Sequence, residues 1–302
     1  MGFDVNTLVA YRDEHALELK GKILWAGDSL KLFQKVPNVT RTAVINYFDV
    51  NPVLTQGTFC QSMNASGSTP ILQKDITVCD MKAEDSWCEN TLQNYYFTTQ
   101  LKGVAGNTLG HWEKDFLNQL TKKILQANEI GAWQSFPTGC LGIFDQLSGD
   151  TSRISVTGAT LSSTTIIAQI QAMINAMLSN AINISQNDDL YLFVSPSVFA
   201  MFMQAMFGNN NFGIPLINYD KNGDTVINFF GPKITLHSTY GLTGTQQMYL
   251  TTLSNLYHAF DGVSDDEKVS LWYEQKDDIL YYRSKYRIGV TYWLGEYMIV
   301  NF

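Results

Sequence analysis

The chain has 302 residues, of which 45% are hydrophobic and only 16% charged, a composition that argues against intrinsic disorder because disordered chains are rich in charge and poor in apolar side chains. The formal net charge is −8, the pI is about 4.9 and no basic run occurs, which argues against a protein built to grip nucleic-acid phosphates. Aromatic residues make up 13% of the chain and favour strands and large contact surfaces.

Targeting and cysteine signals are equally sparse. No run of about 20 apolar residues occurs, so we expect no membrane-spanning helix, and the first residues lack the basic and apolar regions of a signal peptide. The four cysteines have no spacing typical of zinc ligands, and without a secretory signal we expect all of them to be free, metal-free thiols. They are Cys60, Cys79, Cys88 and Cys140.

The first third of the chain predicts an arm followed by a hairpin. Residues 5–33 show weak helical periodicity and predict an arm of helical turns. Residues 43–48 and 71–79 predict two strands, and residues 61–69 between them have only one sizeable apolar side chain, Met63. Because an isolated two-stranded hairpin is only marginally stable in water, we expect it to rest on another part of the assembly, with residues 61–69 working between subunits.

Residues 107–130 predict a long amphipathic helix, which we expect to end at Gly131. At about 1.5 Å per residue, it would be a rod of about 35 Å. We expect one unbroken helix that lies against the C-terminal strands and buries Trp112 and Phe116. Its apolar stripe consists of Leu109, Trp112, Phe116, Leu117, Leu120, Ile124 and Leu125.

The following segments predict an α/β unit. Residues 163–180 form a second amphipathic helix, and residues 190–194 are a continuous apolar strand expected to be buried on both faces. Ser195 is placed to cap a helix that starts at Pro196, the favoured position for proline, and stops at Gly208. The stripe of the second helix consists of Ile166, Ile170, Met173, Ile174, Met177 and Leu178.

The last third of the chain predicts antiparallel strands. Residues 215–218 and 225–229 flank an Asn-Gly pair, which is a strong hairpin signal. Residues 270–274, 280–283 and 286–300 alternate between apolar and polar and predict antiparallel strands.

Sequence patterns typical of catalysis are missing. The four histidines form no HExxH motif, and no GxSxG nucleophile elbow occurs. The glycine-rich residues 103–110 lack the lysine of a phosphate-binding loop and predict a plain loop before the long helix. We therefore predict no catalytic, cofactor-binding or metal-ligating residue, no cofactor, and a protein that is not an enzyme. The histidines are His15, His111, His237 and His258.

Two acidic groups are candidates for cation sites. Asp220, Asn222 and Asp224 imitate the start of a calcium loop, but Thr225 replaces the required glycine and the later glutamate is missing, so a hairpin turn is expected. The second group can be a solvated loop or a weak divalent site at a subunit contact. It consists of Asp261, Asp265, Asp266 and Glu267.

The order of these parts resembles the major capsid protein of tailed bacteriophages, known as the Hong Kong ninety-seven fold. An arm is followed by a long hairpin, a short helix at 86–95, the long helix, an α/β region and closing strands. Specific segments are most similar to capsid proteins of crAss-like phages. They are residues 85–96, 231–242, 255–262 and 286–292.

This resemblance implies an α+β fold with five parts. These are an N-terminal arm at 1–41, an extended β-hairpin loop at 42–80, and a peripheral domain with the spine helix at 81–135. An axial α/β domain would occupy 136–255, and residues 256–302 would return as strands to the peripheral domain. Some members crosslink subunits through a lysine and an asparagine, but no motif here identifies such a pair.

The resemblance also implies a function. The chain would be a structural subunit that assembles with itself, as hexamers and pentamers, into the icosahedral shell around a double-stranded DNA genome. Portal, scaffolding or auxiliary capsid proteins would be its partners, packaged DNA would be contacted only non-specifically, and no membrane would be involved. It would assemble in the host cytoplasm and end in the virion. The alternatives are a phage neck or tail structural protein, or a hydrolase without local signatures.

Overall fold

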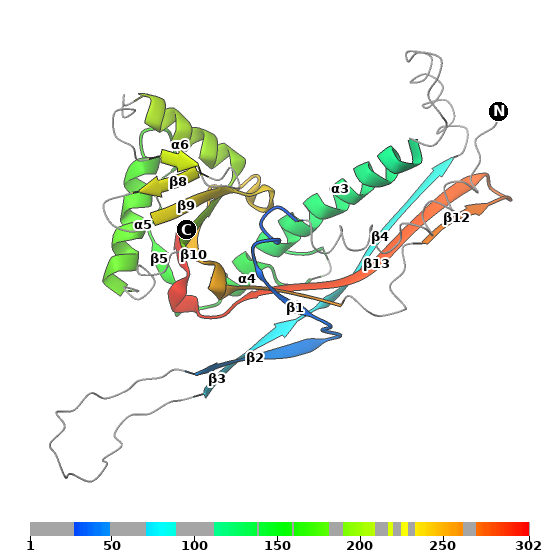
Figure 1. The fold of residues 1–302 in the computed structure, drawn as a ribbon, viewed down its shortest axis with the longest axis horizontal. Coiled ribbons are helices and arrows are strands. Elements are labelled where there is room, and N and C mark those ends of the chain that lie inside the picture. Colours follow the sequence, from blue (N-terminus) through cyan, green and yellow to red (C-terminus); the bar gives the residue numbers. More distant parts are fainter. Residues whose placement is uncertain are drawn as a thin grey trace, which may run out of the picture.

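The computed structural model describes residues 27–48, 71–88, 112–137, 139–158, 160–180, 190–208, 217–219, 225–228, 233–261 and 270–301. Helices and strands are mixed throughout these ranges, so the α+β prediction is confirmed. Figure 1 shows an α/β region, a long helix above a pair of long strands, and a two-stranded hairpin that projects away from both.

The α/β region is built on a seven-stranded sheet with two long helices, α5 (Ile166–Asn180) and α6 (Pro196–Gly208). Strand β6 pairs in parallel with β9 and antiparallel with β10. Apolar side chains from both helices and the sheet form one buried cluster. In order across the sheet, the strands are β5 (Ile154–Val156), β14 (Ile299–Asn301), β10 (Met248–Thr252), β6 (Leu190–Val194), β9 (Lys233–Ser238), β8 (Thr225–Asn228) and β7 (Ile217–Tyr219).

The sequence predicted the centre of this region correctly. Four of the five residues of β6 are buried, as expected for a continuous apolar strand. The Oγ of Ser195 accepts a hydrogen bond from the backbone N–H of Val198 at 3.3 Å, so the predicted cap of α6 is present. The stripe of α5 was predicted one residue too far, because Leu178 is 39% exposed and the buried face ends at Met177.

The other large sheet has five strands and carries the long helix. Its order is β1 (Gln34–Pro37), β11 (Leu256–Phe260), β13 (Ile279–Tyr292) and β12 (Ser270–Glu274), with β4 (Cys79–Cys88) also paired to β13. The prediction of separate strands at 280–283 and 286–300 was wrong. Ser284 is buried and Lys285 exposed, so the alternation of the strand continues through both and β13 remains one strand of 14 residues.

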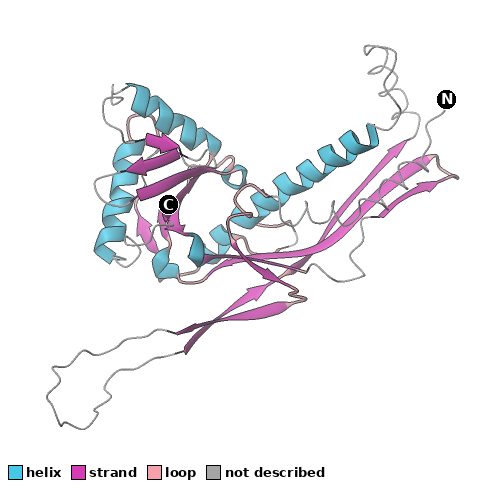
Figure 2. Ribbon diagram, viewed as in Figure 1, coloured by secondary structure: helices cyan, strands magenta, loops and turns pink. Residues whose placement is uncertain are grey.

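Helix α3 (Trp112–Trp133) is one unbroken helix, as predicted, and Figure 2 shows it running along the long strands. The hydroxyl of Tyr286 on β13 donates to Oδ1 of Asn128 on α3 at 2.6 Å. The prediction that Gly131 ends the helix was wrong. A side chain at this position would collide with the ring of Phe136, so the glycine provides space for that ring inside the last turn. The side chains of Trp112 and Phe116 lie outside the described residues.

Several predicted elements are only partly described. The segment at 27–33 forms bends and turns, not a helix, and buries Leu30 and Phe33. The short helix predicted at 86–95 is wrong for its first three residues, which belong to β4. Residues 5–26, 61–69, 103–110 and 220–224 lie outside the described residues. Short helices complete the described parts, namely α4 (Ile143–Ser148), η3 (Tyr240–Leu242), η4 (Leu253–Asn255) and η5 (Gly295–Tyr297).

Candidate assembly surface and its anchors

The hairpin projects from the body of the protein, by which we mean the two larger sheets and their helices. One face of the hairpin is directed toward this body and the other is directed away from it. Strands β2 (Thr42–Phe48) and β3 (Ile71–Thr77) pair antiparallel, as predicted, with Ala43 opposite Ile76 and Ile45 opposite Lys74. Directly opposed residues share a face. The body-facing residues near the base join a small apolar cluster, whose buried members are Val39, Ile76, Val78 and Ala259. The hairpin is therefore anchored at its base.

Apolar residues farther along the hairpin have no such cover. Val44 and Ile71, on the outward face, are 52% and 60% exposed, and Leu72 on the other face is 47% exposed. Figure 1 shows the two strands projecting away from the rest of the described chain, and these three apolar side chains remain largely exposed. Exposed apolar groups gathered on one element are typical of a surface that another protein covers.

The ammonium group of Lys74 on β3 contacts the aromatic ring of Tyr292 on β13. Nζ of Lys74 lies 3.4 Å from the centre of the Tyr292 ring, and the hydroxyl of Tyr292 donates to Oδ2 of Asp150 at 2.6 Å. Burial lowers the pKa of Lys74 to about 8, although the charge of Asp150 acts in the opposite direction. The ammonium group thus sits above an aromatic face and near a carboxylate, as expected of a cation–π contact.

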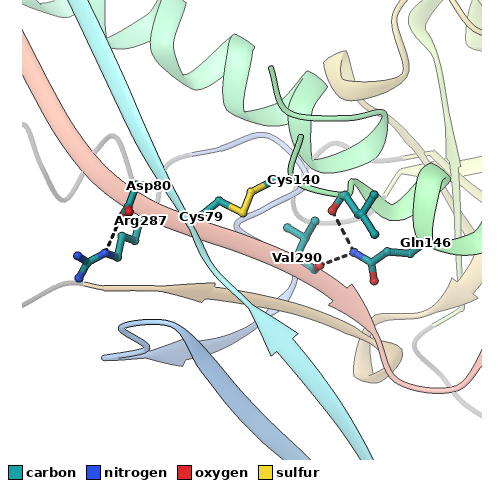
Figure 3. The surroundings of a disulfide bond; sticks show 7 residues. Cys79, Asp80, Cys140, Gln146, Arg287 and Val290 are labelled. Atoms are coloured by element: carbon teal, nitrogen blue, oxygen red, sulfur yellow. Dashed lines mark hydrogen bonds and ion pairs between the residues drawn. A yellow bond between two sulfur atoms is a disulfide. The ribbon is translucent and has the colours of Figure 1, made fainter. Parts of the chain in front are cut away.

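A disulfide lies where the hairpin enters the body. Cys79, the first residue of β4, is bonded to Cys140, which lies between α3 and α4, and their Cα atoms are 6.3 Å apart (Figure 3). The prediction of four free thiols was therefore wrong for these two. Their separation of 61 residues is uninformative in the sequence, and only the fold brings them together. Cys88 is free and exposed, whereas Cys60 lies outside the described residues.

The segment that precedes β1 is held by a buried carboxylate of the long helix. Glu129 accepts hydrogen bonds from the hydroxyl of Ser29 at 2.6 Å and from the backbone N–H of Leu30 at 3.0 Å. The indole N–H of Trp133 donates to the same serine oxygen at 2.7 Å, and Thr239 lies within 3.4 Å of the carboxylate. Burial raises the pKa of Glu129, and the bonds from Ser29 and Leu30 oppose that rise.

The acidic residue Asp261 belongs to an ion pair and not to a solvated loop. It is 3% exposed, and its carboxylate lies 3.0 Å from the guanidinium of Arg287, which also pairs with Asp80 at 2.6 Å. The predicted solvated loop is therefore wrong at this position, while residues 265–267 lie outside the described ranges. Among the residues that the structure describes, no three potential ligands gather around a common point for a metal ion.

The two histidines within the described ranges, His237 and His258, are both buried. Nε2 of His237 lies 3.6 Å from the carboxylate of Asp28. His258 is fully buried on β11, and neither ring nitrogen has a hydrogen-bond partner. Burial, with a smaller contribution from the charge of Lys35, lowers the pKa of His258 to about 4. His15 and His111 lie outside the described residues.

Known structures match this arrangement where sequences do not. No protein-family model and no curated protein matches the chain. A chain from Gordonia phage Cozz has a TM-score of 0.59 at 11% identity, covering 91% of this chain and 86% of that one. A chain in the procapsid of satellite phage P4 has a TM-score of 0.56 at 9% identity, covering 94% and 96%. The chain has the Hong Kong ninety-seven capsid fold.

This fold also occurs outside phages. The virus-like particle from Pyrococcus furiosus matches with a TM-score of 0.56 at 10% identity, over 97% of this chain and all of that one. The capsid fold predicted from the order of elements is thus confirmed over nearly the whole chain. No helix within the described residues is long and apolar enough to cross a membrane.

Proposed function

We propose that this chain is the major capsid protein of a tailed phage, a structural subunit that assembles with itself into an icosahedral shell around double-stranded DNA. The observation that carries the proposal is the capsid fold over more than nine tenths of the chain, combined with a hairpin that leaves Val44, Ile71 and Leu72 exposed. In a closed shell, neighbouring copies would cover that surface, and symmetry would repeat the contact around every capsomer.

We assign residues 1–41 to an arm, 42–80 to the extended loop and 81–135 to the peripheral domain. Residues 136–255 form the axial domain in this scheme, and residues 256–302 return to the peripheral domain. The pairing of β14 with β10 and β5 supports counting residues 299–301 with the axial sheet instead.

Partners and location follow from the same proposal. The subunit would form hexamers and pentamers, meet portal, scaffolding or auxiliary capsid proteins, and assemble in the host cytoplasm before it resides in the virion. Its net charge of −8 favours a container that touches DNA without binding it tightly. The likeness of residues 85–96 and 255–262 to crAss-like phages remains a prediction about the source of the chain.

Sedimentation and electron microscopy of the purified full-length chain test the proposal. We expect capsomers or closed particles at micromolar concentration across a range of salt. Rings or tubes would support a neck or tail protein instead. A strictly monomeric species under all conditions, without particles in micrographs, would contradict a shell subunit.

A further inference from the structure

Cys79 and Cys140 join two segments that meet only through folding. Cys79 is the first residue of the long strand β4, two residues after the hairpin strand β3 ends, and it lies opposite Ile288 of β13. Cys140 lies in the short connection between α3 and α4. The bond therefore links the base of the hairpin to the connection that follows the long helix α3 (Figure 3).

Non-covalent contacts already hold both segments in place. Strand β4 pairs with β13 over ten residues, from Cys79 to Cys88. On the other side, Nε2 of Gln146 donates to the backbone oxygens of Leu141 at 3.1 Å and Val290 at 2.7 Å. Gly289 lets the backbone of Thr77 approach β13 more closely than any side chain would permit. The two sulfur atoms can therefore meet without the bond, and oxidation needs no rearrangement of the fold.

The exposure of the two cysteines is also compatible with reversible thiol–disulfide exchange with a small reagent. Cys79 is half-buried and Cys140 is 9% exposed, so a small reagent can reach the pair from the side of Cys79. The exposed Cys88 stands at the other end of β4, about 30 Å away at the usual rise of a strand, and cannot compete within one subunit. Disulfides rarely persist in a reducing cytoplasm, where such pairs are commonly transient.

We propose that Cys79 and Cys140 act as a redox-controlled lock, with two thiols while the shell assembles in a reducing cell and a disulfide after release. In the oxidation step, the two thiols lose two protons and two electrons to form the S–S bond. A small-molecule disulfide accepts them and is reduced to two thiols. The order of events, reduced during assembly and oxidised after release, rests on the proposed shell function. The pairing of Cys79 with Cys140 does not depend on that function.

The state of the two thiols provides the first test. Cells that express the full-length chain are quenched in acid, and free thiols are alkylated before mass spectrometry. We expect Cys79 and Cys140 to be alkylated in this sample. After the purified protein is incubated with oxidised glutathione, we expect a peptide pair that links Cys79 to Cys140, whereas the exposed Cys88 should carry either the alkyl group or glutathione and should not be linked to either of them. A bond already present in quenched cells would overturn the switch, as would thiols that resist oxidation.

Thermal unfolding of oxidised and reduced protein provides the second test. Closing a loop of about 61 residues predicts a melting temperature about 6 °C higher for the oxidised form. The variants Cys79→Ser and Cys140→Ser should each lose this dependence on reductant, whereas Cys88→Ser should keep it. Equal melting temperatures for the two redox states of the parent protein would overturn the lock. If the chain oxidises as expected but forms no particles, the proposed function fails and the cysteine pairing stands.

Discussion

Two buried titratable side chains, Glu129 and His258, are accommodated in opposite ways. Glu129 receives hydrogen bonds from Ser29 and Leu30, which offset the loss of water around its carboxylate. His258 has no partner for either ring nitrogen, and burial lowers its pKa to about 4. The imidazole is therefore neutral at pH 7, and its protonation is less favourable in the folded chain than in water.

Replacing His258 with leucine should remove an acid sensitivity of the fold. The pKa of this histidine is lower in the folded than in the unfolded chain, so the unfolded chain binds more protons between about pH 4 and 6.5. Its contribution to stability is complete above pH 6.5 and is lost as the pH falls toward 4. Linkage gives a loss of about 2 kcal/mol between pH 7.5 and 5.

Urea unfolding of the parent and His258→Leu proteins at pH 7.5 and pH 5 measures this effect. The variant should be close to the parent at pH 7.5, because the ring nitrogens have no hydrogen bond to lose. It should lose less stability than the parent at pH 5. The difference between the two proteins cancels other groups, including Glu129, whose raised pKa acts in the opposite direction. Parallel losses in both proteins would contradict the assignment to His258.

At the scale of elements, the segment before β1 and helix α3 form one unit through Glu129. This carboxylate reaches Ser29 and Leu30, which lie about a hundred residues earlier in the chain, as well as Thr239. Trp133 extends the network by donating to Ser29. The C-terminal end of the spine helix is thereby tied to the segment that leads into the five-stranded sheet.

Truncating Glu129 should loosen this connection. The variant Glu129→Ala leaves the N–H of Leu30 and the hydroxyl of Ser29 without their acceptor, and we expect a loss of about 3 kcal/mol in the free energy of unfolding. Glu129→Gln keeps one acceptor oxygen and should lose about 1 kcal/mol. Urea unfolding monitored by circular dichroism measures both. The exposed Glu296 is the matched control, since Glu296→Ala should change stability by no more than about 0.5 kcal/mol.

Local sequence patterns correctly predicted the elements whose structure depends mainly on residues nearby in the sequence. The apolar stripe of α5, the apolar run of β6 and the Ser195-Pro196 start of α6 each depend on neighbours in the sequence. Local patterns gave wrong predictions where contacts with residues outside the pattern determine the structure. Gly131 has the appearance of a helix end, but it makes room for Phe136.

The candidate site was less accessible to prediction than the fold. The hairpin could be inferred because residues 61–69, between its two strands, have only one sizeable apolar side chain, Met63. The Cys79–Cys140 bond and the carboxylate of Glu129 could not, since both join segments separated by 61 residues or more. No spacing in a single sequence reports such a contact. The strand β4 was missed for a related reason, because its partner β13 lies far away in the sequence.

At the scale of the whole molecule, the described part of the hairpin is held by the body only near its base, and its distal residues lack contacts that bury them. Its base is buried by Ile76 and neighbouring residues, and Lys74 rests on Tyr292. The distal residues Ile71 and Leu72 contact solvent over about half of their surface or more. Burying apolar area contributes about 25 cal/mol per Å², so covering these side chains in an assembly would yield a modest gain for each subunit.

Charging the distal hairpin should therefore abolish assembly without unfolding the chain. In the variant Ile71→Lys with Leu72→Lys, both new side chains can extend into water, so circular dichroism and the melting temperature of the unassembled protein should match the parent. Assembly should fail because each lysine would lose water at the contact between copies, and symmetry repeats that penalty at every subunit. The exposed, polar Gln171 on helix α5, outside the hairpin, provides the control, and Gln171→Lys should still form particles in electron micrographs. Particles formed equally well by the double variant would show that this surface is not an interface, whereas a variant that fails to fold would show that the two residues belong to an internal core.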